Sequence, residues 1–271
     1  MYVADLTSLL NIPVLKSVVD YYKFLGLSQI RRLDFPENNF SLYFLAYDGP
    51  GSLSANRHWS DRNGVLELTH NYGTENDPDY GIVNGNDEPY CGFGHIAISV
   101  DNVGAACKRL EDANYPFQKR LTDGSDNDMA FAEDPDGYWV EIFRRYDEDL
   151  GDSTDPSTYR LNHSMIRVKS PDVSLQFYQE VMGMTLMRTI EKKDEALSAY
   201  FLGYPGGNPR ANENSKNAVA EWEGMVQLTW FYGTEIQEGK VYHDGNSEPQ
   251  GFGHICMGSN MPNRVLFGIP V

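Results

Sequence analysis

The chain of 271 residues contains an internal repeat, and no other feature of the sequence constrains its fold as strongly. Four blocks occur twice, in the same order and at a nearly constant spacing. Self-similarity on this scale indicates a duplicated structural unit. The sequence therefore predicts two related domains, residues 1–145 and 159–271. The four pairs are Tyr21–Leu27 with Phe177–Met184, Phe40–Tyr47 with Leu197–Tyr204, Val65–Glu75 with Met225–Glu235, and Gly85–Ile96 with Gly245–Ile255.

The stretch between the two repeats, residues 146–158, is acidic and rich in Ser, Asp and Gly. Such a composition is typical of a linker, so we expect the domain boundary here. The chain is long enough for each domain to bury a core of its own. Its 41% hydrophobic and 23% charged residues are typical of a globular protein.

Each repeat combines short strands with amphipathic helices. The predicted strands are rich in β-branched and aromatic residues and are bounded by Gly, Asp or Pro. Val103–Asn114 and Asp172–Met182 carry apolar residues at helical spacing. The order strand, helix and several strands occurs twice in each repeat, which predicts an α+β fold of four modules. The strands include Ser41–Tyr47, Val65–Thr69, His95–Val100 and Tyr138–Phe143.

Charge and composition exclude several function classes. The net charge of −17 leaves no basic surface for nucleic acid, although a small anionic ligand needs only a few cationic groups. No apolar run approaches the length of a membrane span. The three cysteines, Cys91, Cys107 and Cys256, form no regular pattern and favour a reducing compartment. We therefore expect a cytoplasmic protein.

Four polar residues lie inside strand-like segments where an apolar residue is expected: Glu67, His95, Glu141 and His163. A carboxylate in a half-buried strand is costly unless it is paired or binds a metal. Two histidines and two carboxylates without cysteine suit a divalent ion such as zinc or nickel. Taken alone, each histidine fits an ordinary hydrogen-bonded core position, and a glutamate on the solvent face needs no special role.

The motifs GFGHI, DPDGYWVEI, LELTHNYGTE, SLYFLAY and NHSMIRVKSPDVSLQFY together resemble glyoxalase I (lactoylglutathione lyase) of the vicinal-oxygen-chelate superfamily. More narrowly, the chain is similar to the fused two-repeat form found in fungi. The resemblance covers most of residues 20–258 and implies tandem domains built of paired βαβββ modules. At both ends the chain departs from the family, so we expect an atypical first strand and a truncated second repeat.

In this family each metal site has four protein ligands from two paired modules. The resemblance implies that modules 2 and 3 contribute His95, Glu141, His163 and Gln227, with zinc as the metal and nickel as the alternative. The family usually has glutamate where Gln227 stands. Glu141 would then be the catalytic base, moving a proton within the hemithioacetal of methylglyoxal and glutathione to form S-lactoylglutathione.

The resemblance also implies the groups that bind glutathione. Arg167, Lys119, Gly124 and Thr229 match family contacts to the substrate, although Arg167 and Lys119 could equally be ordinary solvated charges. Two positions differ from the family. Cys91 replaces an arginine before GFGH, and Phe231 replaces an asparagine that repeat 1 keeps as Asn71. Each lost contact to a charged ligand group costs roughly 1.5–3 kcal/mol.

The second site, from modules 1 and 4, lacks two of its four ligands. Glu67 and His254 match the family, but no counterpart of His163 precedes Tyr22 and no counterpart of Glu141 follows His254. We expect this site to be inactive.

Three functions stay open at this point. The first is a glyoxalase I with one working site, expected to be a monomer. The second is a catalytically impaired remnant that still binds glutathione or metal, which Gln227 and Cys91 favour. The third is an extradiol dioxygenase with iron bound by His95, Glu141 and His163, although the sequence has no recognisable dioxygenase signature.

Overall fold

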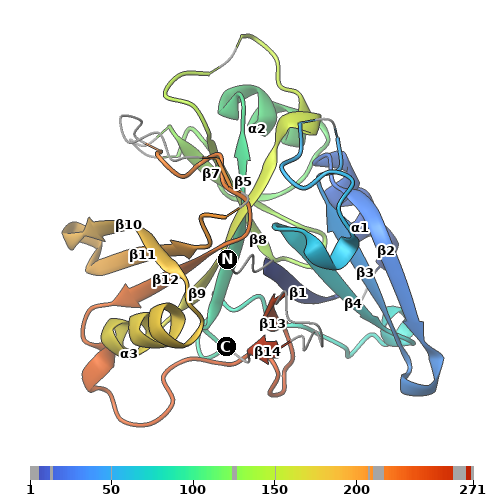
Figure 1. Ribbon diagram of the computed structural model, residues 1–271. Helices are drawn as coiled ribbons and strands as arrows, with labels where there is room; N and C mark the ends of the chain where they lie inside the picture. The colour runs from blue at the N-terminus through green and yellow to red at the C-terminus, as the bar shows by residue number, and fades with distance from the viewer. Residues whose placement is uncertain are drawn as a thin grey trace.

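A computed structural model describes residues 6–12, 15–49, 51–123, 127–149, 151–206, 208–209, 217–258 and 267–269. These residues form two β-sheets with helices packed on the outside (Figure 1). Within this part of the chain, no helix is both long enough and apolar enough to cross a membrane. The mixed α+β fold predicted from the sequence is confirmed.

The larger sheet has eight strands, and the strands from the two repeats meet at its centre. Its β5 and β9 pair antiparallel, which joins the second half of repeat 1 to the first half of repeat 2. In sheet order the strands are β10 (Thr185–Lys192), β11 (Leu197–Gly203), β12 (Met225–Phe231), β9 (Arg160–Arg167), β5 (Phe93–Val100), β8 (Trp139–Arg144), β7 (Met129–Glu133) and β6 (Phe117–Lys119).

The smaller sheet has six strands among the described residues and also draws on both repeats. Its β1 lies between β4 of repeat 1 and β13 of repeat 2. Neither sheet therefore belongs to one repeat, because repeat 1 contributes four strands to each sheet and repeat 2 contributes described strands to both. The order is β14 (Phe267–Ile269), β13 (Phe252–Met257), β1 (Leu6–Ile12), β4 (Val65–Asn71), β3 (Phe40–Ala46) and β2 (Ser28–Phe35).

The helices follow the predicted amphipathic segments. Helix α2 (Val103–Asp112) begins at Asn102, whose side chain accepts a hydrogen bond from the Ala105 amide and caps the helix. Helix α3 (Pro171–Gln176) continues as a π-helical turn over Phe177–Val181, close to the predicted end at Met182. Helix α1 (Leu15–Phe24) is the counterpart of α3 in repeat 1.

The segment predicted as a linker is hydrogen-bonded to repeat 1. Thr154 and the Asp155 amide both donate to the carboxylate of Asp101, and Asn102 donates to the carbonyl of Gly151. These bonds hold the chain against the start of α2 before it enters β9.

Two segments that are related by the repeat, residues 83–91 and 243–250, connect the two sheets and cross each other. They are called the crossing segments of repeat 1 and repeat 2. The Val83 amide donates to the carbonyl of Gln250 at 2.9 Å, and the His243 amide donates to the carbonyl of Cys91 at 2.7 Å. Just beyond them the rings of Phe93 and Phe252 stack with their centroids 4.2 Å apart. This packing sets the position of β5 relative to β13.

Candidate metal centre

The residues predicted to bind metal lie on one face of the eight-stranded sheet. His95 on β5 and Gln227 on β12 are both in register with Met165 of the central strand β9. Residues in register share a face, and side chains two positions apart on a strand point the same way. His163, two residues before Met165, is therefore on the same face as His95 and Gln227.

Glu141 completes this group from the other side of β5. It is in register with Ala97, which lies two residues after His95. Its Oε2 atom lies 3.1 Å from His95 Nε2 and 3.3 Å from His163 Nε2. The three ligand atoms lie within 4.8 Å of one another, and all three residues are buried. Three of the residues predicted as metal ligands therefore lie together in this sheet.

The chemistry of these three groups fits a divalent cation. Both Nε2 atoms, of His95 and His163, are buried without a hydrogen-bond partner of good geometry. Buried polar atoms are rarely left unpartnered, and a ligand is a common reason. Two imidazole nitrogens and a carboxylate that converge on one point form a typical zinc or nickel donor set. Gln227 uses its amide nitrogen to donate to Thr229 at 3.0 Å, so its carbonyl oxygen can serve as a neutral fourth ligand.

The electrostatics of the group keep it in the form that binds metal. Burial by itself raises the pKa of Glu141, but the imidazoles of His163 and His95 close to its carboxylate outweigh burial and hold that pKa well below its usual range. Burial also lowers the pKa of His95, which favours the neutral imidazole. At neutral pH the centre therefore offers an ionised carboxylate beside a neutral nitrogen ligand.

The comparisons with known proteins agree with this geometry. The family model described as "Glyoxalase/Bleomycin resistance protein/Dioxygenase superfamily" matches residues 9–142 and again residues 160–262. A protein of Saccharomyces cerevisiae named Glyoxalase I is 43% identical over 262 residues, which cover 93% of this chain and 78% of the yeast protein. This chain belongs to the glyoxalase I family.

Two further relatives support the assignment. A protein of Schizosaccharomyces pombe named lactoylglutathione lyase is 41% identical, over 89% of this chain and 76% of that protein. The crystal structure of glyoxalase I from Zea mays has a TM-score of 0.67 and 22% sequence identity, and covers 96% of this chain and 76% of the maize chain. The maize structure supports the fold alone.

The residues predicted to bind the substrate do not all lie in the same place. Thr229 lies two residues beyond Gln227 on the same face of β12. Lys119, at the end of β6, is in register with Phe131, which is itself in register with Glu141, so the lysine also shares the ligand face. Gly124 lies outside the described residues.

Arg167 is on the ligand face, but most of its guanidinium is already hydrogen-bonded. Its Nη1 donates to the carbonyls of Gly85 and Phe93 at 2.9 and 2.8 Å, and its Nη2 donates to Asn86 Oδ1 at 2.9 Å. These contacts fasten β9 to the crossing segment of repeat 1. Cys91, which directly precedes the GFGH motif, donates from its Sγ to the carbonyl of the same Asn86 at 3.5 Å.

Aromatic side chains enclose the histidines, and sequence reasoning missed them. The ring centroid of Phe131 lies 5.2 Å from that of His95, and Phe201 lies 5.2 Å from His163. A signal for Phe201 was present in the sequence. It recurs as Phe44 in the block SLYFLAY, and Phe44 is in register with Glu67 as Phe201 is with Gln227.

In the smaller sheet the equivalent positions do not make a complete ligand set. Glu67 and His254 flank β1, and both are in register with Leu9. Burial raises the pKa of Glu67 to about 7, and burial lowers the pKa of His254. Among the described residues these two have no third histidine or carboxylate close enough to form a metal-binding group. They therefore do not fit a tightly bound cation.

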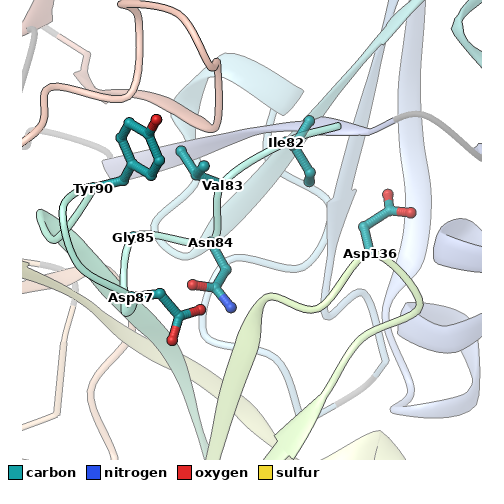
Figure 2. A pocket seen from close by; sticks show the side chains of 7 residues that line it. All are labelled: Ile82, Val83, Asn84, Gly85, Asp87, Tyr90 and Asp136. Atoms are coloured by element: carbon teal, nitrogen blue, oxygen red, sulfur yellow. The ribbon is translucent and has the colours of Figure 1, made fainter. Parts of the chain in front are cut away.

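A separate small pocket of about 130 Å³ lies where the crossing segment meets the turn after β7 (Figure 2). Asn84 fixes this junction by donating to the carbonyl of Gly137 at 3.0 Å. Burial raises the pKa of Asp136 in this pocket to about 7. In Figure 2 the side chains of Asp136 and Asp87 point in different directions, so the carboxylates do not converge on a common ligand.

Proposed function

We propose that this chain is a lactoylglutathione lyase that isomerises the hemithioacetal of methylglyoxal and glutathione to S-lactoylglutathione at His95, Glu141, His163 and Gln227. The observation that carries the proposal is the buried convergence of His95, Glu141 and His163, with Glu141 at 3.1 and 3.3 Å from the two imidazoles. The 43% identity with yeast Glyoxalase I supports the same activity.

Glu141 has the properties that a base needs for this reaction. Its low pKa leaves it ionised at neutral pH, and it lies at the centre of the group. Its carboxylate takes the proton from the carbon that bears sulfur and hydroxyl. It then returns a proton to the neighbouring carbonyl carbon. The hydroxyl proton moves to the second oxygen, so the thioester product has the same atoms as the hemithioacetal.

A divalent metal bound here supplies positive charge that polarises the two substrate oxygens and stabilises negative charge during the proton transfer. His95, His163 and the carbonyl oxygen of Gln227 would hold it together with Glu141. The nitrogen and oxygen donors, with no cysteine among them, favour zinc, and nickel is the alternative. Phe131 and Phe201 pack beside the imidazoles and keep water from the reacting carbons.

We infer one working site in each chain, because Glu67 and His254 lack the other ligands. We also infer that the protein acts as a monomer, since the modules that build the centre both come from one chain. The three cysteines are free thiols, in keeping with a reducing cytoplasm. With a charge of −17, nucleic acid is not expected as a partner.

A matched pair of variants tests this function. Zinc-loaded wild type, Glu141→Gln and Glu67→Gln are assayed for thioester formation from methylglyoxal and glutathione. We expect Glu141→Gln to lose at least roughly 100-fold in kcat, because it removes the base. Glu67→Gln should keep the wild-type rate, because it changes the incomplete site. Equal activity in wild type and Glu141→Gln would contradict the mechanism.

The wild-type protein, loaded with zinc in one sample and with iron in another, separates the alternatives. A wild-type protein that binds about one zinc per chain but forms no thioester would be a silent remnant of the family. Activity on a catechol with bound iron, and none on the hemithioacetal, would instead identify a dioxygenase. Either result would overturn the proposed lyase activity.

A further inference from the structure

Asn162 directly precedes His163 and is the extra residue of a β-bulge. His163 is in register with Ala97 on β5, and Leu161 is in register with the next residue, Ile98, so Asn162 has no partner across the strand pair. Bulges are frequent beside active sites because they redirect side chains. This one allows the side chains of two consecutive residues to meet.

The equivalent strand of the smaller sheet has no bulge at this place. There, Leu6 and Thr7 of β1 are in register with the consecutive residues Met257 and Cys256 of β13. The bulge therefore occurs in the strand that carries the complete ligand set and not in its counterpart.

The side chain of Asn162 is hydrogen-bonded on both sides. Its Oδ1 lies 2.8 Å from Nδ1 of His163, and the residue is 1% exposed. Its amide nitrogen donates to the carbonyls of Val219 and Trp222 at 3.0 and 2.8 Å, with a longer contact of 3.3 Å to Ala220. Because carbonyls only accept, the amide orientation is determined and Oδ1 must face the imidazole.

This orientation decides which nitrogen of His163 can bind metal. An amide oxygen accepts hydrogen bonds, so Nδ1 of His163 has to carry the proton. The lone pair then lies on Nε2, which is the atom 3.3 Å from Glu141. A hydrogen bond of this kind to the far nitrogen is how proteins commonly orient a histidine ligand.

We propose that Asn162 is a positioning residue that holds His163 in the Nδ1–H tautomer and directs Nε2 to the metal. The inference rests on the proposed metal centre and adds the group that orients one of its ligands.

The segment that holds Asn162 also contacts the strands of the other two ligands. This segment, residues 217–222, lies between β11 and β12. Asn217 donates to the carbonyl of Arg144 on β8 at 2.9 Å, and Ser99 of β5 donates to the carbonyl of Ala220 at 2.6 Å. Together with Asn162, these bonds connect one segment of repeat 2 to all three strands that carry His95, Glu141 and His163. The orientation of Asn162 is therefore fixed relative to the whole centre.

The tautomer of His163 can be observed directly in the wild-type protein. The zinc-loaded protein is labelled with 15N, and the imidazole resonances of His163 are assigned by comparison with a His163→Gln sample. We expect a slowly exchanging proton on Nδ1 and zinc bound to Nε2. Zinc on Nδ1, or a proton on Nε2, would overturn this inference alone. A wild-type protein that binds no zinc would overturn the proposed metal centre as well.

Two substitutions at Asn162 then separate positioning from packing. Asn162→Leu removes the acceptor and should weaken zinc binding, measured by chelator competition, roughly 10- to 100-fold. Asn162→Asp keeps an oxygen opposite Nδ1 but loses the donor to the carbonyls of Val219 and Trp222, so it should recover part of that loss. The matched control is Asn208→Leu. Asn208 also bonds the backbone on both sides, at the carbonyl of Tyr204 and the amide of Glu223, but it does not contact a ligand. Equal zinc affinities for Asn162→Leu and Asn208→Leu would contradict the proposal.

Discussion

Thr7 in β1 takes the register position that His163 takes in β9. Thr7 is in register with Val65 and Cys256 of the smaller sheet, and His163 is in register with the corresponding residues Met225 and Ala97 of the larger sheet. The smaller sheet therefore has a threonine in its sequence at the position where the larger sheet has a histidine.

The second missing ligand is explained in the same way. Glu141 is in register with Ala97 through the parallel pairing of β8 and β5. At the corresponding place, Gly268 of β14 is in register with Cys256 through an antiparallel pairing with β13. Among the described residues, the strand beside His254 therefore brings no carboxylate to the position that Glu141 occupies.

Substitution of one of the two equivalent histidines should lower the metal content, and substitution of the other should not. His95→Ala should lower bound zinc from about one per chain to well below one, because it removes a buried ligand. His254→Ala should leave the zinc content unchanged, because its site has only two of the four ligands. Atomic absorption on dialysed protein measures both. A loss of zinc in His254→Ala alone would show that the smaller sheet holds the metal.

Gln227→Glu should strengthen metal binding. An ionised carboxylate attracts a divalent cation more strongly than a neutral amide oxygen, and the side chain has nearly the same shape. We expect the Kd for zinc to fall roughly tenfold, which corresponds to about 1.4 kcal/mol. Gln237→Glu, on an exposed turn, is the control for the added charge. An unchanged Kd in Gln227→Glu would mean that this side chain does not reach the metal.

Glu67 should make the metal-free protein less stable as the pH rises. Its pKa is raised to about 7 by burial, so between about pH 4.5 and 7 the unfolded chain has lost this proton and the folded chain still holds it. The stabilisation that the protonated Glu67 contributes is complete below the pKa that Glu67 has in the unfolded chain, about 4.5. It is lost as the pH passes 7. Over this range the free energy of unfolding should fall by about 2–3 kcal/mol relative to Glu67→Gln.

Urea unfolding of wild type and Glu67→Gln at pH 5 and pH 8 measures this difference. The exposed Glu37→Gln serves as the control for loss of a surface charge. A stability difference between wild type and Glu67→Gln that is the same at both pH values would contradict the buried, protonated state of Glu67.

Arg167→Met should affect both stability and substrate binding. Three hydrogen bonds from its guanidinium to Gly85, Phe93 and Asn86 would be lost, and each acceptor left buried costs about 1–3 kcal/mol. The KM for the hemithioacetal should also rise, because a cation on the ligand face is removed. Arg120→Met is the control, since the Arg120 guanidinium forms an exposed ion pair with Glu111 and lies over the ring of Phe117, away from the crossing segment. Full stability with a raised KM would show that the hydrogen bonds to the crossing segment contribute little.

Several features of the centre could be predicted from the sequence. His95, Glu141 and His163 are polar residues inside strand-like segments, and the repeat places His95 and His254 in the same motif. A strand pattern also predicts which face a side chain takes, so the shared face of Gln227 and Thr229 follows from their spacing of two. Local pattern did not reveal Asn162. A bulge depends on the partner strand, and the asparagine looks like any polar residue before a histidine.

The amino-acid sequence was enough to establish the duplication, the α+β class and the family, and to single out three residues that converge in the larger sheet. Only the folded chain reveals that each sheet combines strands of both repeats and that Thr7 has the same register position in the smaller sheet as His163 has in the larger one. It also reveals that Arg167 is held by the crossing segment and that Asn162 faces Nδ1 of His163. The physical reason is that periodicity and motifs are local properties of the chain. Register and hydrogen bonding between strands more than 60 residues apart, such as β5 with β9, depend on how the whole core packs.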